Sequence, residues 1–201
     1  MRRNGGFTLI EMLVVISILG ALASLVLALV PIARFHQNRA VCMKHVQDLV
    51  GILEAASLGR YPSHSGADLV LYAVTRGDIA GRDALRSLFC PGDLEESLDD
   101  AGGVAAYADL KLDGTHGHLT SYAGRAQSDR ACRAGRGAMP ALALVADDSE
   151  DHHDGKGFVV GLTGGSVHWR DKHDDYGLPI TRPVFVGEGS EVEELRCLRA
   201  E

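Results

Sequence analysis

The chain has 201 residues and a formal net charge of −7, a length that suits one anchored domain or at most two small ones. The acidic balance, with no basic stripe of interleaved aromatic residues, argues against nucleic acid as a partner. With 24 glycines and 5% aromatic residues, the composition favours a turn-rich α+β domain with a modest core.

The first predicted element is an apolar helix close to the N-terminus. No charged side chain occurs from Met12 to Ala33, and a helix of that length spans roughly 30 Å, the thickness of the hydrocarbon core of a bilayer. A secretory signal would have a shorter apolar region followed by a small-residue cleavage site. A plain signal anchor would explain the length but neither the Gly5-Gly6 pair nor Glu11. A carboxylate in lipid costs roughly 2.5–3.5 kcal/mol, so Glu11 calls for a role of its own.

The opening residues MRRNGGFTLIEMLVVISILGAL resemble the type III signal of type IV pilins and type II secretion pseudopilins. The shared features are a short basic leader, Gly6 directly before Phe7, the block Phe-Thr-Leu-Ile-Glu and an apolar helix. The resemblance implies that a prepilin peptidase and N-methyltransferase in the membrane cleaves between Gly6 and Phe7 on the cytoplasmic side, and that Phe7 is then methylated. It also implies a leader at residues 1–6, a transmembrane segment at 7–33 and an extracytoplasmic domain at 34–201, held by a single pass in the inner membrane.

Cleavage would leave a cationic amine on Phe7, with which Glu11 of a neighbouring subunit would pair when subunits stack. Two other roles stay open, because Glu11 would also reach its own Phe7 amine one helical turn away or the lipid headgroups. The assembly role predicts a structural, non-enzymatic subunit of a type IV pilus-like or type II secretion pseudopilus filament. Its partners would be other pilin or pseudopilin subunits and an inner-membrane assembly platform. The alternatives are a membrane-anchored extracytoplasmic binding protein and, less favoured, a membrane-tethered metallohydrolase.

An amphipathic stripe continues the helix beyond Pro31, where a kink is expected. Its apolar members recur at three- and four-residue spacing: Phe35, Cys42, Val46, Leu49, Leu53 and Ala56. The helix is expected to end near Gly59, after about fifty residues. The sequence therefore predicts a long N-terminal helix whose second half packs on a small antiparallel sheet.

The predicted elements downstream are shorter. A helix is expected at about Ala67–Thr75, capped by Ser65, followed by loop with one helical turn at 76–116. The predicted strands are Leu119–Ala123, Ala141–Ala146, Gly157–Leu162 and Ser166–Arg170. The last two flank Thr163-Gly164-Gly165, which indicates a tight hairpin. The C-terminal EVEELRCLRAE is predicted as a short helix.

Further blocks narrow the resemblance. RAVCMKHVQDLVGIL, RYP, FCPGD, TSYAG and HHDGKGFVVGLTGGSVHW, in that order, resemble pilin-like proteins abundant in planctomycete-type bacteria, which carry a C-terminal His-x9-Asp-Gly motif. His153 occupies the motif histidine, whereas Thr163 replaces the motif aspartate. We therefore expect a structural role for His153, which would fix the entry to the hairpin by a hydrogen bond.

The stretch DDSEDHHDGK is the most polar constellation in the chain. Its plain interpretation is a solvated loop between strands. Carboxylates suit calcium and paired histidines suit zinc, but the spacing fits neither an EF-hand nor HExxH. Some pseudopilins hold calcium in a late loop, and that resemblance makes Asp147, Asp148, Glu150 and Asp151 the candidate calcium ligands. No other cofactor is expected, and no GxSxG elbow or other sign of a catalytic triad occurs.

The four cysteines form no CxxC pair, which argues against zinc-ribbon and thioredoxin-like sites. Cys42 lies on the apolar stripe, where it is expected to be a small buried side chain. Cys90 and Cys132 are predicted in loops that flank the strands, where a cross-link would support sparse packing. A Cys90–Cys132 disulfide is therefore the first choice among the pairings.

Overall fold

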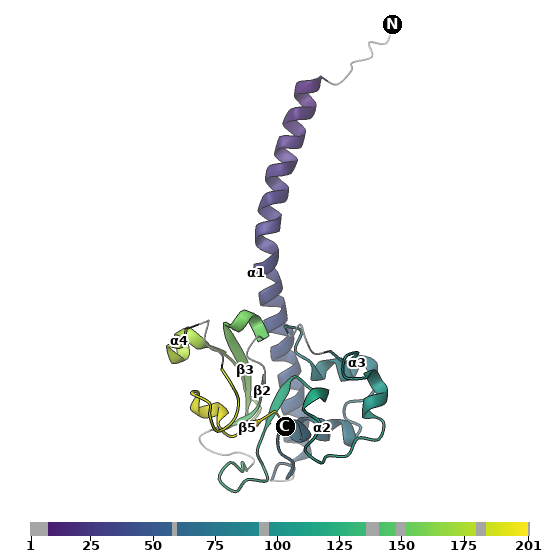
Figure 1. Ribbon diagram of the computed structural model, residues 1–201, viewed down its shortest axis with the longest axis vertical. Coiled ribbons are helices and arrows are strands. Elements are labelled where there is room, and N and C mark those ends of the chain that lie inside the picture. The colour runs from purple at the N-terminus through teal and green to yellow at the C-terminus, as the bar shows by residue number, and fades with distance from the viewer. Residues whose placement is uncertain are drawn as a thin grey trace. The chain divides into compact units, whose positions relative to one another are not determined.

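The computed structural model describes residues 8–57, 60–92, 97–135, 141–147, 152–179 and 184–200. The chain forms two compact units, Met1–Gln37 and Asn38–Glu201. Helix α1 (Leu9–Ala56) begins in the first unit and ends in the second (Figure 1). Pro31 lies within this helix. The helix ends close to the predicted position, although Leu58 and Gly59 lie outside the described residues.

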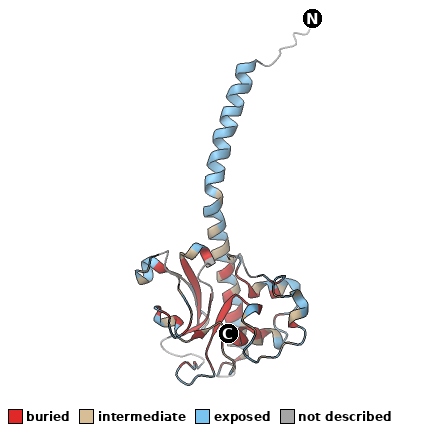
Figure 2. Cartoon of the chain, viewed as in Figure 1, coloured by how far each residue is buried: buried red, intermediate tan, exposed pale blue. Residues whose placement is uncertain are grey.

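The described residues of the first unit are Thr8 and the N-terminal part of α1. From Leu9 to Leu29 every side chain is exposed, and Figure 2 shows this part of the helix in pale blue. Within the described part of the chain, α1 is the one helix long and apolar enough to cross a membrane, judged by length and composition. An exposed apolar helix of this kind would be costly in water, because its side chains have no protein surface against which to pack.

In the second unit, α1 buries one side of its C-terminal half. The buried residues Cys42, Val46, Leu49, Val50 and Leu53 follow the predicted stripe, with Val50 added. They join the larger core cluster together with strand residues such as Leu144, Val145 and Val159. The stripe therefore places Cys42 in the interior of the domain.

The sheet has five strands in the order β4-β3-β2-β1-β5, and every pairing is antiparallel. The strands are β1 (Tyr122–Arg125), β2 (Ala143–Asp147), β3 (Gly157–Leu162), β4 (Val167–Asp171) and β5 (Leu198–Arg199). The predicted α+β fold, a long N-terminal helix followed by a small antiparallel sheet, is confirmed. Strand β3 has the predicted bounds, whereas β1 begins later than expected because Leu119 ends the 3-10 helix η3 (Gly117–Leu119).

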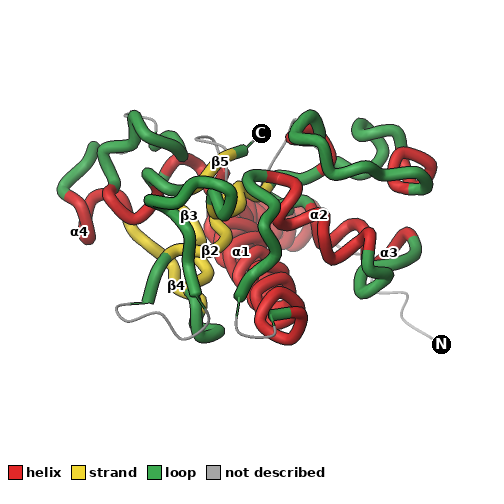
Figure 3. The backbone as a smooth tube through the Cα atoms, turned by 90° about the horizontal axis from the view of Figure 1, so that it is seen from below, coloured by secondary structure: helices red, strands yellow, loops and turns green. Residues whose placement is uncertain are grey.

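Both faces of the central strands are buried. On one face α1 lies so close that a Cβ added at Gly161 would be 2.4 Å from Val50 Cγ2. Helix α2 (Ala67–Thr75) covers β1 on that side, where a Cβ at Gly124 would be 2.2 Å from the carbonyl oxygen of Gly66. Figure 3 shows β2 and β3 between α4 (Lys172–Tyr176) on one side and α2 and α3 (Arg82–Leu85) on the other.

The second face is covered by the C-terminal segment. Phe158, Val160 and Leu162 of β3 join a separate apolar cluster with Val192, Leu195 and Leu198. The segment contains the 3-10 helix η5 (Glu193–Leu195) and then strand β5, which pairs with β1. The prediction of a single short helix was therefore wrong for this segment, because pairing with β1 places Leu198 and Arg199 in a strand.

Two local predictions also need correction. Helix α2 has the predicted bounds, but its N-cap is Gly66 and no described side chain makes a capping hydrogen bond there. Ser65 instead shares a hydrogen bond with Ser128 across 2.6 Å. The region predicted as loop with one helical turn contains α3, η1 (Arg86–Leu88) and η2 (Gly103–Tyr107). Helix α4, which was not predicted, has Asp171 as its N-cap, accepting from the backbone of His173 and Asp174.

Candidate functional site

The N-terminal end of α1 holds the first candidate group, Glu11. Gly6 and Phe7 lie outside the described residues. The Glu11 carboxylate accepts hydrogen bonds from the Thr8 backbone N–H (2.7 Å) and the Thr8 hydroxyl (2.9 Å), and the Glu11 N–H donates back to the Thr8 hydroxyl (3.3 Å). This reciprocal pattern is a capping box, which satisfies backbone donors at the start of the helix. Within one chain, Glu11 therefore already has a local structural role.

The second candidate is a buried cluster of Cys42, Cys90, Asp147 and His153. Cys42 comes from α1, Cys90 follows η1, Asp147 ends β2, and His153 belongs to η4 (His152–Gly155). One ligand atom from each residue lies within 4.8 Å of the others. Four separate segments of the second unit thus meet at one point.

The distances within the cluster are short. The Cys42 Sγ donates to Asp147 Oδ1 at 3.0 Å. His153 Nε2 lies 3.4 Å from Cys90 Sγ and 3.4 Å from Asp147 Oδ2. All four residues are buried, and the side chains of Asp147 and His153 are 0% exposed. Water is therefore excluded from a group that contains two thiols, an imidazole and a carboxylate.

The interior location controls the protonation of these groups. Burial raises the pKa of the Cys42 thiol well above its ordinary value, and Cys90 and Asp147 raise that pKa further. Burial alone would lower the pKa of His153, but hydrogen bonds to Asp147 and Cys90 outweigh burial and raise that pKa to about 9. In the absence of a cation, His153 thus lies as a cation against the Asp147 carboxylate, beside the thiol of Cys42.

A surrounding layer of donors and packing holds the cluster in place. The Val159 N–H donates to Asp147 Oδ2 (2.9 Å), and the Gly92 N–H points at Cys90 Sγ (3.4 Å). The Tyr122 hydroxyl lies 3.5 Å from Cys42 Sγ. Cys42, Cys90 and Asp147 therefore each have a further polar group directed at their sulfur or oxygen atoms.

The backbone at His153 is unusual. His153 and Asp154 both have φ of 57°, a left-handed conformation that costs a non-glycine residue about 1–3 kcal/mol and persists only where the surroundings impose it. The imidazole meets the Trp169 ring edge to face at 5.2 Å, and the Arg39 guanidinium lies 4.6 Å from the centre of the Trp169 ring. These contacts fix the orientation of the histidine ring toward the two cysteines and the aspartate.

The sequence-predicted site residues are only partly brought together. Of the calcium candidates, Asp147 is described, and its carboxylate faces Cys42 and His153 in the interior instead of a solvated loop. Asp148, Glu150 and Asp151 lie outside the described residues. Thr163, which replaces the motif aspartate, ties the hairpin to the residue before β2, since its hydroxyl accepts from the Leu142 N–H (3.0 Å) and its N–H donates to the Leu142 carbonyl (2.8 Å).

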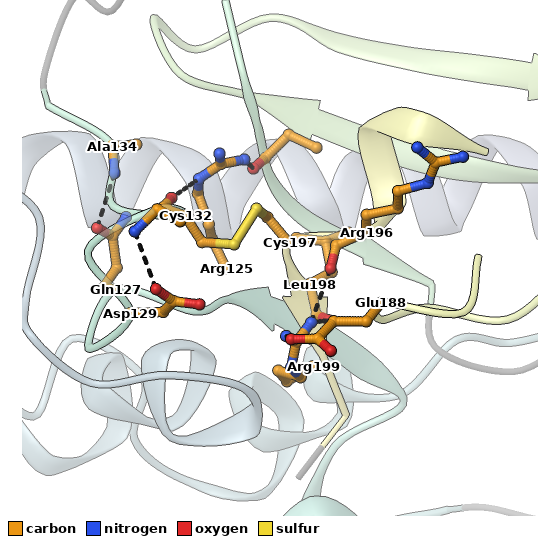
Figure 4. Close-up of a disulfide and its surroundings, with 12 residues drawn as sticks. Arg125, Gln127, Asp129, Cys132, Ala134, Glu188, Arg196, Cys197, Leu198 and Arg199 are labelled. Carbon is orange, nitrogen blue, oxygen red and sulfur yellow. Dashed lines mark hydrogen bonds and ion pairs between the residues drawn. A yellow bond between two sulfur atoms is a disulfide. The ribbon is translucent and has the colours of Figure 1, made fainter. Parts of the chain in front are cut away.

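The predicted Cys90–Cys132 disulfide is wrong. Cys132 is bonded to Cys197, and Cys90 and Cys42 are free thiols in the interior. Pairing of β5 with β1 brings Cys197 to this edge of the sheet, where the Ala126 N–H donates to the Cys197 carbonyl (2.8 Å). Figure 4 shows the disulfide with Arg125, whose guanidinium donates to the carbonyl oxygens of Cys132 and Ala143.

Sequence reasoning missed the cluster because its four residues have no local spacing in common. Each carried a separate signal: Cys42 on the helical stripe, Cys90 in the FCPGD block, Asp147 in the acidic stretch and His153 at the motif position. Only the fold of the second unit shows that the four positions coincide.

Comparison with known protein families gives a match at the N-terminus. Residues 1–27 match the model of the prokaryotic N-terminal methylation motif. The N-terminal segment is of the prepilin type. This match supports a type IV pilin-like or pseudopilin-like protein that is processed by a prepilin peptidase, and with the apolar helix it fits a membrane-anchored, single-pass chain. No curated protein and no solved structure matches the chain.

Proposed function

We propose that the chain is a structural subunit of a type IV pilus-like or type II secretion pseudopilus filament. A prepilin peptidase cleaves it between Gly6 and Phe7 and methylates Phe7, leaving residues 7–33 as a membrane segment with a cytoplasmic N-terminus. Residues 34–201 form the extracytoplasmic domain. The observation that carries the proposal is the match of residues 1–27 to the methylation motif, at the start of a helix whose residues Leu9–Leu29 are exposed and, apart from Glu11, uncharged.

The unpacked part of α1 supports an assembly role. In the membrane, lipid covers these apolar side chains, and in a filament the corresponding helices of neighbouring subunits replace the lipid. The hydroxyls of Ser17 and Ser24 donate hydrogen bonds to the backbone carbonyls of Leu13 and Ala21. They therefore present no unsatisfied donor to lipid or to a neighbouring helix.

Glu11 is the residue that separates assembly from simple anchoring. Its capping box with Thr8 accounts for a carboxylate or an amide at this position, because Glu and Gln serve equally there. Pairing with the Phe7 amine of a neighbour, in contrast, requires the negative charge. The two roles therefore make different demands on the same side chain.

Three variants test these demands in membranes that contain the peptidase and the assembly machinery. Glu11→Gln keeps the cap and removes the charge, Thr8→Ala removes the hydroxyl half of the cap and keeps the charge, and Glu11→Leu removes the Glu11 half of the cap together with the charge. All three should insert and be processed normally. Crosslinking should give multimer ladders for wild type and Thr8→Ala and none for the two Glu11 variants.

Other crosslinking results would identify a different role for Glu11 or for the chain. Normal ladders from Glu11→Gln, with loss in Thr8→Ala, would show that Glu11 acts only as a cap. Absence of multimers from wild type in the same membranes would favour an anchored binding protein. Intact mass of the membrane-extracted chain gives the cleavage site independently, and a mature chain that retains Met1 would refute the prepilin assignment.

A further inference from the structure

We propose that Cys42, Cys90, Asp147 and His153 bind one Zn²⁺ ion, which fastens helix α1 to the sheet. The site rests on the geometry of the second unit alone and does not depend on the proposed role in filament assembly. It is a structural site, because all four positions around the metal are taken by protein side chains that are closed off from water.

The separations between the ligand atoms are close to those of a tetrahedral zinc site. Zinc binds sulfur at about 2.3 Å and imidazole nitrogen or carboxylate oxygen at about 2.0–2.2 Å, so neighbouring ligand atoms around it are about 3.3–3.8 Å apart. The observed distances are 3.0 Å for Cys42 Sγ to Asp147 Oδ1 and 3.4 Å for His153 Nε2 to both Cys90 Sγ and Asp147 Oδ2. No separation within the set exceeds 4.8 Å, so side-chain shifts of about 1 Å or less would bring the four atoms to tetrahedral positions around the ion.

The chemistry of the donors selects the metal. Two sulfurs, one imidazole nitrogen and one carboxylate oxygen form a soft, four-coordinate set that suits Zn²⁺. Calcium is excluded from this set, because it takes six to eight oxygen ligands. The thiols of Cys42 and Cys90 lose their protons to solvent on binding, since zinc coordinates thiolates.

The layer around the cluster compensates the remaining charge. One Zn²⁺ with two thiolates and one carboxylate leaves a single net negative charge in the interior. The Gly92 N–H at Cys90 Sγ, the Tyr122 hydroxyl at Cys42 Sγ and the Val159 N–H at Asp147 Oδ2 each place a donor against one of these anionic ligands. Outer donors of this kind orient the ligands of zinc sites and stabilise their charge.

The backbone around His153 fits a ligand that is held in advance. Its backbone has a left-handed φ of 57°, its Nε2 lies 3.4 Å from Cys90 Sγ and from Asp147 Oδ2, and Trp169 packs against the ring edge to face. Gly92 approaches so closely that an added Cβ would lie 3.1 Å from the His153 backbone nitrogen. A strained and tightly enclosed histidine of this kind is characteristic of a functional position.

Two other arrangements would use the same residues. Asp147 and His153 alone would form a buried ion pair with two inert thiols beside it, and Cys42 with Cys90 would form a second disulfide. Zinc accounts for more of the structure than either, because it gives both sulfurs, the carboxylate and the imidazole a common partner.

The experiment uses the full-length chain purified in detergent. Metal analysis of the untreated protein should find about one zinc ion per chain. After a chelator has removed the metal, added Co²⁺ should occupy the empty site and give the absorption bands of tetrahedral thiolate-bound cobalt. Added Zn²⁺ should then displace the cobalt and abolish those bands. The cobalt titration is made on the wild-type chain, so it decides the proposal even where a variant does not fold.

Matched variants locate the ion. Cys42→Ser, Cys90→Ser and His153→Ala should each lose the metal and the cobalt bands. The double variant Cys132→Ser with Cys197→Ser carries the same chemical change at the disulfide and should retain them, as should His173→Ala, whose side chain is 73% exposed. Retention of metal by Cys42→Ser or His153→Ala would overturn the proposal.

Two results with the wild-type chain would also overturn it. A folded chain that takes up neither Co²⁺ nor Zn²⁺, and alkylates at both thiols once unfolded, would leave the buried ion pair as the correct description. Peptide mapping without reductant that finds Cys42 joined to Cys90 would replace the metal site with a disulfide.

Discussion

The two pairs of cysteines in this chain lie in contrasting surroundings. Cys132 and Cys197 form a disulfide at the edge of the sheet, between a loop and the start of β5. Cys42 and Cys90 stay as thiols in the interior, beside a histidine and an aspartate. The first pair joins the C-terminal segment to the loop after β1, and the second pair faces a set of groups typical of metal ligands.

The contrast shows how neighbours decide the role of a thiol. Near the disulfide, the polar groups of Arg125 and Gln127 make hydrogen bonds to backbone atoms, so none of these bonds competes for sulfur. Near Cys42 and Cys90, a carboxylate and an imidazole lie within hydrogen-bond distance of the sulfur atoms. The disulfide holds the C-terminal segment that covers the second face of the sheet. The cluster of Cys42, Cys90, Asp147 and His153 connects the first face to α1.

Removal of the disulfide is the largest change that we expect. The bond closes a loop of 65 residues, and the double substitution Cys132→Ser and Cys197→Ser should lower the free energy of unfolding by about 4 kcal/mol, chiefly because the unfolded chain gains freedom. Denaturant unfolding of the full chain in detergent measures this, with hydrogen exchange to follow β5. A loss below about 1 kcal/mol would show that packing alone holds the C-terminal segment.

The packing of that segment gives the next effect. Leu195 is 1% exposed and belongs to the cluster on the second face, so Leu195→Ala should cost about 3 kcal/mol through lost burial and the cavity left behind. Glu193→Ala, at an exposed position of the same 3-10 helix, is the control and should change the free energy of unfolding by less than about 0.5 kcal/mol. Equal effects of the two would mean that the segment is not docked on the sheet.

The packing of α1 on the first face of the sheet is tested by adding a methyl group between them. An added methyl at Gly161 would lie 2.4 Å from Val50 Cγ2 and 2.8 Å from Val46 Cγ1, so Gly161→Ala should cost about 2 kcal/mol. Gly51→Ala makes the same change on α1 itself, where nothing lies within 4 Å, and should raise the free energy of unfolding by up to about 1 kcal/mol. Opposite signs for the two glycines would support close packing of the helix on the sheet. A neutral Gly161→Ala would contradict it.

The sequence predicted the elements whose signals are local. Helix α2 and strand β3 have the predicted bounds. The signal for α2 is an apolar run with helical spacing, and the signal for β3 is an alternation of side chains with a period of two before the turn Thr163-Gly164-Gly165. Both signals lie within the element itself and need no information from elsewhere in the chain. Strand β5 has two residues and is a strand only because β1 lies beside it. The Cys132–Cys197 disulfide was not predicted for the same reason, because the pairing of β5 with β1 is what brings Cys197 close to Cys132.

The candidate site was predictable to a smaller extent. Asp147 and His153 were singled out from the sequence, but for calcium binding and for a hydrogen bond at the hairpin. Their partners Cys42 and Cys90 lie far away in the chain, on a helix and after a 3-10 turn. A helical stripe shows that Cys42 is buried but not which side chain it meets, because helix spacing carries no information about the opposite surface.

The smallest predicted effect concerns Gly92, which lies against the second cysteine pair. An added Cβ would be 3.1 Å from the His153 backbone nitrogen, 3.4 Å from His153 Nδ1 and 3.6 Å from Cys90 Sγ, so the neighbours must move by a few tenths of an ångström. Gly92→Ala should therefore lower the free energy of unfolding by about 1 kcal/mol, at the low end for added volume in a packed interior. It should also speed alkylation of Cys90 in the folded chain, because the displacement falls on His153 and Cys90 together. The Cys132–Cys197 disulfide should be unaffected, so peptide mapping with and without reductant provides the internal control. If Gly92→Ala leaves the reactivity of Cys90 unchanged while stability falls, the strain is released elsewhere and the close contact of Gly92 with His153 does not position the cluster.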